Sequence, residues 1–201
     1  MKRELQMEES KVDYFLSAKE EFRTIAKQDS RWSFDRPINL VFKNLFTLTS
    51  QMYGIRIQSY LAEKLSLTRV NDVDDKGDFR NVKGAYIENK ASYLNDTYAF
   101  VQLRPYQNLD AYVLTAIDRE NDFSPRFFVL TEEQMRYEIE KLASTAHCSK
   151  KAAAQNVNIE YRITLNPKTY HWTRWINNYE VDSIECLKRR VRSLIPNERN
   201  I

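Results

Sequence analysis

The sequence has few glycines, and their scarcity excludes several classes of nucleotide-binding enzyme. Only three of the 201 residues are glycine, namely Gly54, Gly77 and Gly84. A Gly-rich dinucleotide-binding loop therefore has no place in the chain, and the phosphate-binding loop G-x-x-x-x-G-K-[ST] is absent as well. We expect no nucleotide cofactor.

Cysteines, histidines and long apolar runs are also rare. The two cysteines and two histidines show no C-x-x-C or H-x-x-x-H spacing, which disfavours a zinc site. We interpret Cys148 and Cys186 as reduced core residues. No segment approaches the roughly 20 apolar residues that span a bilayer, and Met1 is followed by the charged residues 2–4 rather than by an apolar segment. The sequence predicts a cytoplasmic protein that does not associate with membranes.

Charge is distributed unevenly along the chain. Residues 1–140 carry 20 Lys and Arg against 23 Asp and Glu, whereas residues 141–201 carry 11 against 5. The last part of the chain is therefore at +6 while the first part is at −3. Basic side chains release condensed counterions when they contact phosphates, so the last third is a candidate nucleic-acid surface. For the run from 188 to 192, a solvated helix face is an equally good interpretation.

Hydrophobic periodicity predicts helices before and between short strands. Three helices are expected in the first part of the chain, over 10–28, from near Pro37 to Met52, and after Gly54 to Leu65. A fourth is expected from the Thr131–Gln134 capping box to about Ala143. A fifth is expected from the caps Asp182 and Glu185 to just before Pro196. Strands are expected over 68–73, 78–82, 85–92, 111–118, 126–130 and 158–165. This order predicts an α/β (α+β) fold, in which N-terminal helices precede a mixed β-sheet flanked by helices.

An acidic cluster is the strongest chemical signal in the sequence. Asp78 is followed ten residues later by Glu88, and Lys90 lies two residues further on. Side chains alternate along a strand, so Glu88 and Lys90 point to the same face. A hairpin that turns at Gly84 would bring the Asp78 carboxylate beside that of Glu88. Two carboxylates and a lysine are typical of a Mg²⁺ site for phosphodiester hydrolysis.

A purely structural interpretation of the cluster is a Lys–Glu pair on a solvated sheet face. An acid two residues before a lysine also occurs at Glu9 with Lys11 and at Asp74 with Lys76, so the spacing alone decides nothing. Only Glu88 is expected on a strand with apolar neighbours. A charge in such a half-buried strand is costly unless it is paired or bound to a metal, which favours the metal site.

The order of these residues resembles the core of the PD-(D/E)XK nuclease superfamily, which includes most type II restriction endonucleases. The matching features are a helix that carries Glu63, then Asp78, and then the strand with Glu88 and Lys90. The resemblance covers about 55 residues, from Gly54 to about position 107, and is one of pattern rather than of sequence.

The resemblance implies a restriction-endonuclease-like core and a role for each of these residues. Mg²⁺ would be bound by Asp78, Glu88 and the backbone carbonyl of Asn89. Lys90 would assist the attacking water, and Glu63 would be an auxiliary acid on the preceding helix. One departure is that glycine, and not proline, precedes Asp78.

Basic and amide side chains in the last third are the candidate DNA contacts, because amides suit adenine edges and cations suit phosphates or guanine. The candidates are Lys150, Lys151, Gln155, Asn156, Asn158, Arg162 and Arg174. An ordinary surface loop is an equally good interpretation for any one of them. Trp172 and Trp175 are three residues apart, which favours packing in a core or a dimer contact over base stacking.

The sequence therefore predicts a Mg²⁺-dependent endodeoxyribonuclease that acts on double-stranded DNA, and we favour a type II restriction enzyme that acts as a homodimer. Residues 1–201 would form one nuclease domain, with an N-terminal helical region and possible dimer contact (1–53), a catalytic core (54–130) and a basic DNA-binding region (131–201). Two alternatives are a structure- or end-directed repair or recombination nuclease and a non-catalytic nucleic-acid-binding module.

Overall fold

The strands with the longest apolar runs form the centre of a mixed sheet. In the computed structural model, which describes residues 34–70, 77–105, 109–146 and 159–196, β5 (Ala111–Asp118) pairs antiparallel with β6 (Ser124–Thr131) and parallel with β3 (Tyr86–Tyr93). Three two-residue strands complete this six-stranded sheet in the order β1-β2-β3-β5-β6-β9. They are β1 (Thr68–Arg69), β2 (Phe79–Arg80) and β9 (Glu180–Val181).

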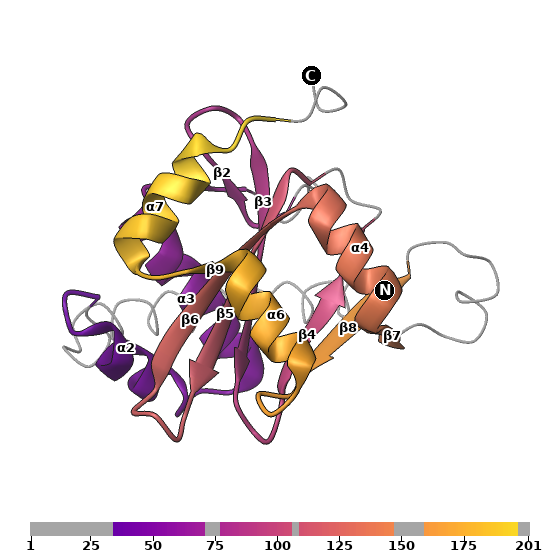
Figure 1. Ribbon diagram of the computed structural model, residues 1–201. Helices are drawn as coiled ribbons and strands as arrows, with labels where there is room; N and C mark the ends of the chain where they lie inside the picture. The colour runs from indigo at the N-terminus through magenta and orange to yellow at the C-terminus, as the bar shows by residue number, and fades with distance from the viewer. Residues whose placement is uncertain (1–33, 71–76, 106–108, 147–158, 197–201) are drawn as a thin grey trace, which may run out of the picture.

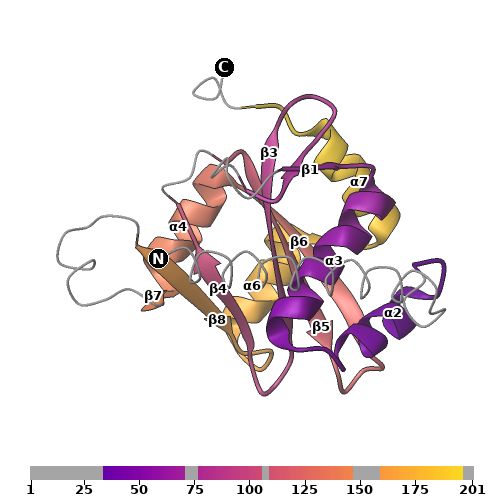
Figure 2. The same ribbon diagram turned by 180° about the vertical axis from the view of Figure 1, so that it is seen from behind.

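Each face of the six-stranded sheet is covered by a separate layer. One face packs against α2 (Ile38–Leu45), α3 (Ser50–Leu65) and α7 (Ile184–Ser193), and α3 crosses the front of the sheet in Figure 2. The other face packs against α4 (Glu132–Leu142), α6 (Tyr170–Tyr179) and a second, antiparallel sheet in the order β4-β8-β7 (Figure 1). The strands of this second sheet are β4 (Tyr98–Leu103), β7 (Ala143–Ala146) and β8 (Glu160–Leu165).

The alternation of side chains along β5 explains why both faces are apolar. Val113 and Ile117 pack among the α2, α3 and α7 side chains, whereas Leu114 and Ala116 pack on the opposite side. Burying both faces of a strand in this way requires a nearly continuous apolar run, as in AYVLTAID. The mixed α/β fold class predicted from the sequence is confirmed.

Two of the expected helix boundaries differ from those in the structure. The break between the second and third helices falls at 46–49, with Thr49 as the N-cap, and Gly54 lies inside α3. A helix tolerates an interior glycine at a cost of about 1 kcal/mol, so Gly54 does not end one. The last helix is capped by Ser183, not Asp182, because the Ser183 hydroxyl accepts the N–H of Cys186 at 3.2 Å. The helix expected over 10–28 lies outside the described residues.

Several local predictions are confirmed in detail. Both reciprocal hydrogen bonds of the capping box between Thr131 and Gln134 are present at the start of α4. Trp172 and Trp175 are buried in the core, as the packing interpretation expected, and they do not form a base-stacking surface. Helix α6 and strands β4, β7 and β9 were not predicted.

A buried carboxylate joins α4 to α6. Glu138 is fully buried and accepts hydrogen bonds from Tyr179 Oη at 2.7 Å and from Trp175 Nε1 at 2.9 Å. It also forms an ion pair with Arg174, whose Nη1 lies 2.6 Å from Glu138 Oε1. Arg174 was a candidate DNA contact, but its guanidinium is instead bound to this carboxylate. Leaving one partner of such a pair buried alone is strongly destabilising.

We expect Glu138→Ala to lower the free energy of unfolding at pH 7 by about 3–5 kcal/mol, because the partly buried Arg174 would lose its ion pair and the buried Trp175 and Tyr179 would lose their hydrogen-bond acceptor. Burial alone raises the pKa of Glu138, but the hydrogen bonds from Arg174, Tyr179 and Trp175 outweigh it and hold the pKa below its ordinary value of 4.5. The stabilisation should therefore be complete above the ordinary pKa and be lost as pH falls through the lower, folded-state pKa.

Urea unfolding of the wild type and of Glu138→Ala across this pH range measures both effects. The exposed Glu140 of the same helix offers a control, since Glu140→Ala should change stability by no more than about 0.5 kcal/mol. A gap between the wild type and Glu138→Ala that stays constant from pH 7 to strongly acidic pH would contradict the charged-pair account.

Candidate functional site

The β2–β3 hairpin is shaped by two glycines in left-handed backbone conformations. Gly77, with φ of 80°, precedes β2, and Gly84, with φ of 91°, ends the turn that begins at Asn81. The strands pair antiparallel with Phe79 opposite Ile87. This is the hairpin that the sequence predicted.

Asp78 lies at the point where β2 stops pairing with β3. Its backbone N–H still donates to Ile87 O at 3.0 Å. Its side chain then serves as the hydrogen-bond acceptor that a further β2 residue would otherwise supply. Asp78 Oδ2 accepts the N–H of Asn89 at 2.8 Å. The carboxylate is thus fixed at the edge of β3 by a backbone hydrogen bond.

Helix α3 contributes a second contact to Asp78. Gln58 Nε2 donates to Asp78 Oδ1 at 2.6 Å, and Gln58 Oε1 in turn accepts from Arg69 Nη2 of β1 at 3.2 Å. Both carboxylate oxygens of Asp78 therefore have partners, which set the orientation of the group. Sequence reasoning missed Gln58, although its position beside Ile57, on the buried stripe of the helix, could have suggested it.

Glu88 and Lys90 lie on β3 and form an ion pair between Glu88 Oε1 and Lys90 Nζ. The Glu88 side chain is only 5% exposed and that of Lys90 is 20% exposed. Neighbouring Ile87 and Ala91 pack on the opposite face, against the α2, α3 and α7 layer, as strand alternation requires. The pair is therefore not on a solvated face, and a charge so deeply buried needs a partner.

The charges of Asp78 and Glu88 influence each other. Burial raises the pKa of Asp78, and the negative charge of Glu88 raises it further, to about 7. Lys90 and the N–H of Asn89 oppose this rise. Two nearby carboxylates destabilise each other's charged forms, and a cation between them relieves the repulsion.

The donor set suits a hard cation. The N–H and C=O of one strand residue point to the same side of the strand, so the Asn89 carbonyl lies on the side of β3 where Asp78 accepts the Asn89 N–H. Asp78, Glu88 and this carbonyl together offer oxygen donors of the kind that Mg²⁺ takes, and Mg²⁺ commonly uses one or two carboxylates and retains several waters. Among the described residues, no group of three or more His, Cys, Asp or Glu side chains could hold a metal ion.

Among the described residues, no recorded contact joins Glu63 to Asp78, Glu88 or Lys90. The Glu63 side chain is 58% exposed, and its carboxylate lies 3.9 Å from Lys64 Nζ. The α3 residue that contacts Asp78 is Gln58, five positions earlier. A five-residue step turns a helix by about 140°, which separates the two side chains around its axis.

Most of the predicted DNA contacts lie outside the described residues. These are Lys150, Lys151, Gln155, Asn156 and Asn158, all between β7 and β8. Arg162 is described and is exposed on β8 opposite Ser144.

Among the described residues, no helix is both long and apolar enough to cross a membrane.

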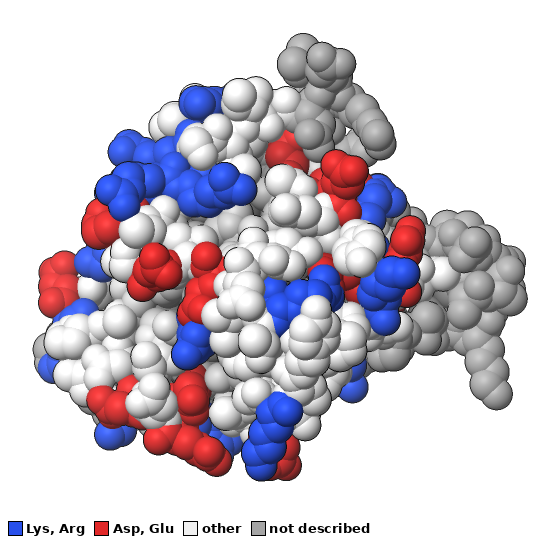
Figure 3. Space-filling model, in the orientation of Figure 1, with Lys and Arg blue, Asp and Glu red and all other residues white. Residues whose placement is uncertain are grey.

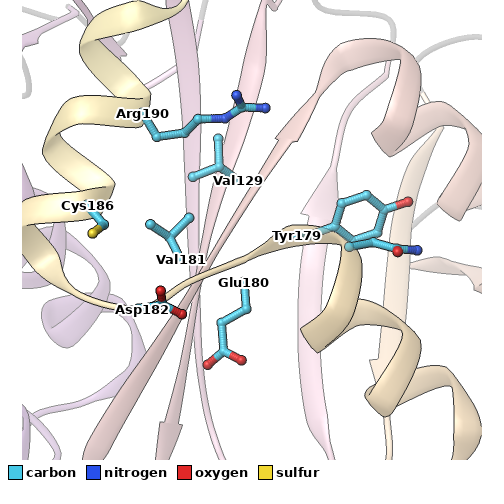
Figure 4. Close-up of a pocket in the computed structure, with 8 residues that line it drawn as sticks. Val129, Tyr179, Glu180, Val181, Asp182, Cys186 and Arg190 are labelled. Carbon is cyan, nitrogen blue, oxygen red and sulfur yellow. The ribbon is translucent and has the colours of Figure 1, made fainter.

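A pocket of about 280 Å³ lies between the end of α6, β9 and α7 (Figure 4). Glu180, Asp182, Cys186 and Arg190 contribute to its lining, and Glu180 forms an ion pair with Arg126 at 2.8 Å. Cys186 is a free thiol and is partly exposed, so the interpretation of this cysteine as a core residue is wrong. No lining residue comes from β2 or β3, so the pocket is separate from the acidic site.

Comparisons with known proteins provide no family for this chain. No protein-family model matches the sequence, and no curated protein matches it either. The functional argument therefore rests on the geometry of the acidic site.

Proposed function

We propose that the protein is a Mg²⁺-dependent endodeoxyribonuclease with a restriction-endonuclease-like core that hydrolyses phosphodiester bonds in double-stranded DNA. The observation that carries the proposal is the arrangement of Asp78, Glu88 and Lys90 at the edge of β3, where β2 stops pairing. Two carboxylates and an ammonium group at a sheet edge suit attack of water on a phosphate.

Each residue of the acidic site would have a role that follows from its chemistry. Asp78 and Glu88, with the Asn89 carbonyl, would hold Mg²⁺, which when bound supplies Lewis-acid polarisation of a phosphoryl oxygen and of water. Lys90 would orient the attacking water and stabilise the negative charge that develops on the phosphate. Gln58 would keep the Asp78 carboxylate in position through its hydrogen bond of 2.6 Å.

Within this class we favour a type II restriction enzyme in the cytoplasm, acting as a homodimer, because two-fold symmetry matches a palindromic site and lets two copies cut both strands. A structure- or end-directed nuclease would use the same acidic site. The two differ in whether they select a sequence or a branched or ended DNA form.

One observation favours a second candidate, a nucleic-acid-binding module without catalytic activity. Glu88 already has an internal partner in Lys90, so the buried charge is compensated without a metal. In that case the acidic cluster would stabilise the hairpin, and only the basic side chains of residues 141–201 would contact nucleic acid.

Incubation of the full chain with a panel of DNA forms, in Mg²⁺ and in EDTA, tests the proposal. The panel contains long linear duplex, supercoiled plasmid, branched duplex and single strands. A restriction enzyme gives discrete bands from long duplex only in Mg²⁺, whereas a structure-directed nuclease prefers the branched or ended forms. Binding without cleavage of any form in Mg²⁺ or Mn²⁺ would instead support the non-catalytic module.

A further inference from the structure

Basic side chains gather at the end of the molecule where α7 meets the β2–β3 turn. We call Lys188, Arg189 and Arg192 of α7, together with Lys83 of the turn, the α7 basic face. Arg189, Arg192 and Lys83 are exposed, and Lys188 is partly exposed. Figure 3 shows Lys and Arg side chains concentrated over α7.

The helix geometry keeps these charges on the solvent side. At 3.6 residues per turn, Lys188, Arg189 and Arg192 occupy an arc of about 100°. Leu187 and Val191 lie on the opposite side of the helix and are both fully buried against the sheet. The α7 basic face is therefore held on a helix whose other side is part of the core.

The same helix is fastened to the hairpin that carries the acidic site. Asn81 Nδ2 donates to Val191 O at 2.8 Å and to Leu194 O at 3.0 Å, and Lys83 Nζ donates to Ser193 O at 3.4 Å. Asn81 follows Asp78 by three residues, or about 10 Å of extended chain. The point where α7 is attached to the hairpin is therefore separated from Asp78 by the length of about three base-pair steps of duplex DNA.

We propose that the α7 basic face binds the phosphate backbone of duplex DNA beside the acidic site, an inference that rests on the proposed nuclease function. Guanidinium and ammonium groups neutralise phosphates and release condensed counterions. Arg189 Nη2 contacts Cys186 Sγ at 3.0 Å, which leaves the other donors of this guanidinium for phosphate oxygens. The basic face would help to hold a duplex whose phosphodiester bond is attacked by water at the acidic site, with the sugar hydroxyl as the leaving group.

The buried side of α7 argues against a membrane as the partner. A helix that lies on a bilayer inserts its apolar side between lipids. The apolar side of α7 is already packed in the protein core, at Leu187 and Val191. What remains for a partner is a charged side with three cations and one acid, the exposed Glu185 of the first turn, and its net positive charge fits a polyanion.

The salt dependence of DNA binding tests the inference. A fluorescein-labelled duplex of mixed sequence is titrated in EDTA, where no cleavage occurs, with wild type and with the Lys188→Ala/Arg189→Ala/Arg192→Ala variant. Between about 50 and 200 mM salt, the slope of log affinity against log salt should become shallower by about 2–3, one for each lost phosphate contact, with at least about a tenfold loss of affinity. The exposed lysines of the Lys43→Ala/Lys141→Ala/Lys168→Ala variant provide a control with the same charge change, which should keep the wild-type slope.

The outcomes separate the surface from the catalytic proposal. If the α7 variant keeps the wild-type slope while wild type cleaves DNA in Mg²⁺, this inference is overturned and the nuclease stands. If the α7 variant loses affinity but wild type never cleaves, the DNA surface stands and the nuclease fails. Equal losses in both triple variants would indicate a non-specific charge effect and overturn the inference, as would binding to phosphatidylserine vesicles without binding to DNA.

Discussion

Lys90→Ala is expected to lower the rate of Mg²⁺-dependent DNA cleavage by about 10²- to 10⁴-fold, the range that a positioned proton-transfer or charge-stabilising group contributes. The reason is that Lys90 forms an ion pair with Glu88, is only 20% exposed, and lowers the pKa of Asp78 through its positive charge. DNA affinity in EDTA should remain close to that of wild type. Single-turnover cleavage of a duplex substrate measures the rate, and a separate titration measures the affinity.

A folding measurement and two further variants are the controls for Lys90→Ala. Removing Lys90 leaves Glu88 buried without a partner, which costs stability, so thermal unfolding must show that the protein is folded at the assay temperature. Lys90→Arg keeps the positive charge and should retain more activity than Lys90→Ala, though less than wild type, because the guanidinium is larger and planar. Lys43→Ala on α2 should cleave as wild type does. Wild-type cleavage by Lys90→Ala would remove the lysine from the proposed chemistry.

Gly77→Ala is expected to have the second large effect, through backbone geometry rather than through a lost ligand. The left-handed φ of 80° costs an alanine roughly 1–2 kcal/mol. A Cβ at this position would also lie 2.9 Å from Ile87 O, the carbonyl that anchors the N–H of Asp78, and 2.7 Å from Leu109 Cδ2. The substitution should therefore displace Asp78, lower the unfolding free energy by more than the φ cost alone, and reduce cleavage.

The other two glycines provide graded controls for this prediction. At Gly84 the nearest atom to an added Cβ is the flexible end of the Arg80 side chain at 3.3 Å, so Gly84→Ala should cost mainly the backbone strain of its φ of 91°. At Gly54, inside α3, nothing lies within 4 Å, and Gly54→Ala should stabilise the protein by about 0.5–1 kcal/mol. Urea unfolding of the three variants measures the order, and equal effects at Gly77 and Gly54 would contradict it.

The sequence predicted those parts of the fold that depend on local pattern. The apolar run of β5 predicted its bounds, because a strand buried on both faces needs a nearly continuous run of apolar residues, here interrupted only by Thr115 before Asp118 ends the strand. The α4 start was predicted from Thr131 and Gln134, whose hydrogen bonds are local. The β2–β3 hairpin followed from the spacing of Asp78 and Glu88 around Gly84.

Features that depend on distant contacts were not predictable. The hydrogen bond from Gln58 to Asp78 joins residues 20 positions apart, and the Arg174 to Glu138 pair joins residues 36 apart. No local pattern indicates such partners, so Arg174 looked like a free cation when its charge is in fact compensated. Likewise, the attachment of α7 to the hairpin through Asn81 spans 110 positions, and the fold alone determines it.

The most direct test of the central claim is the Mg²⁺ dependence of duplex cleavage by wild type, Asp78→Asn and Glu88→Gln, measured on proteins of verified folding. Both substitutions keep the size of the side chain but remove a charged oxygen donor, so they act on the site more than on the core. Cleavage by wild type that rises with Mg²⁺ and is lost in both variants, but not in the exposed Glu140→Gln control, is the result that we predict. Wild-type cleavage rates in either Asp78→Asn or Glu88→Gln, at the same Mg²⁺ concentrations, would contradict the account.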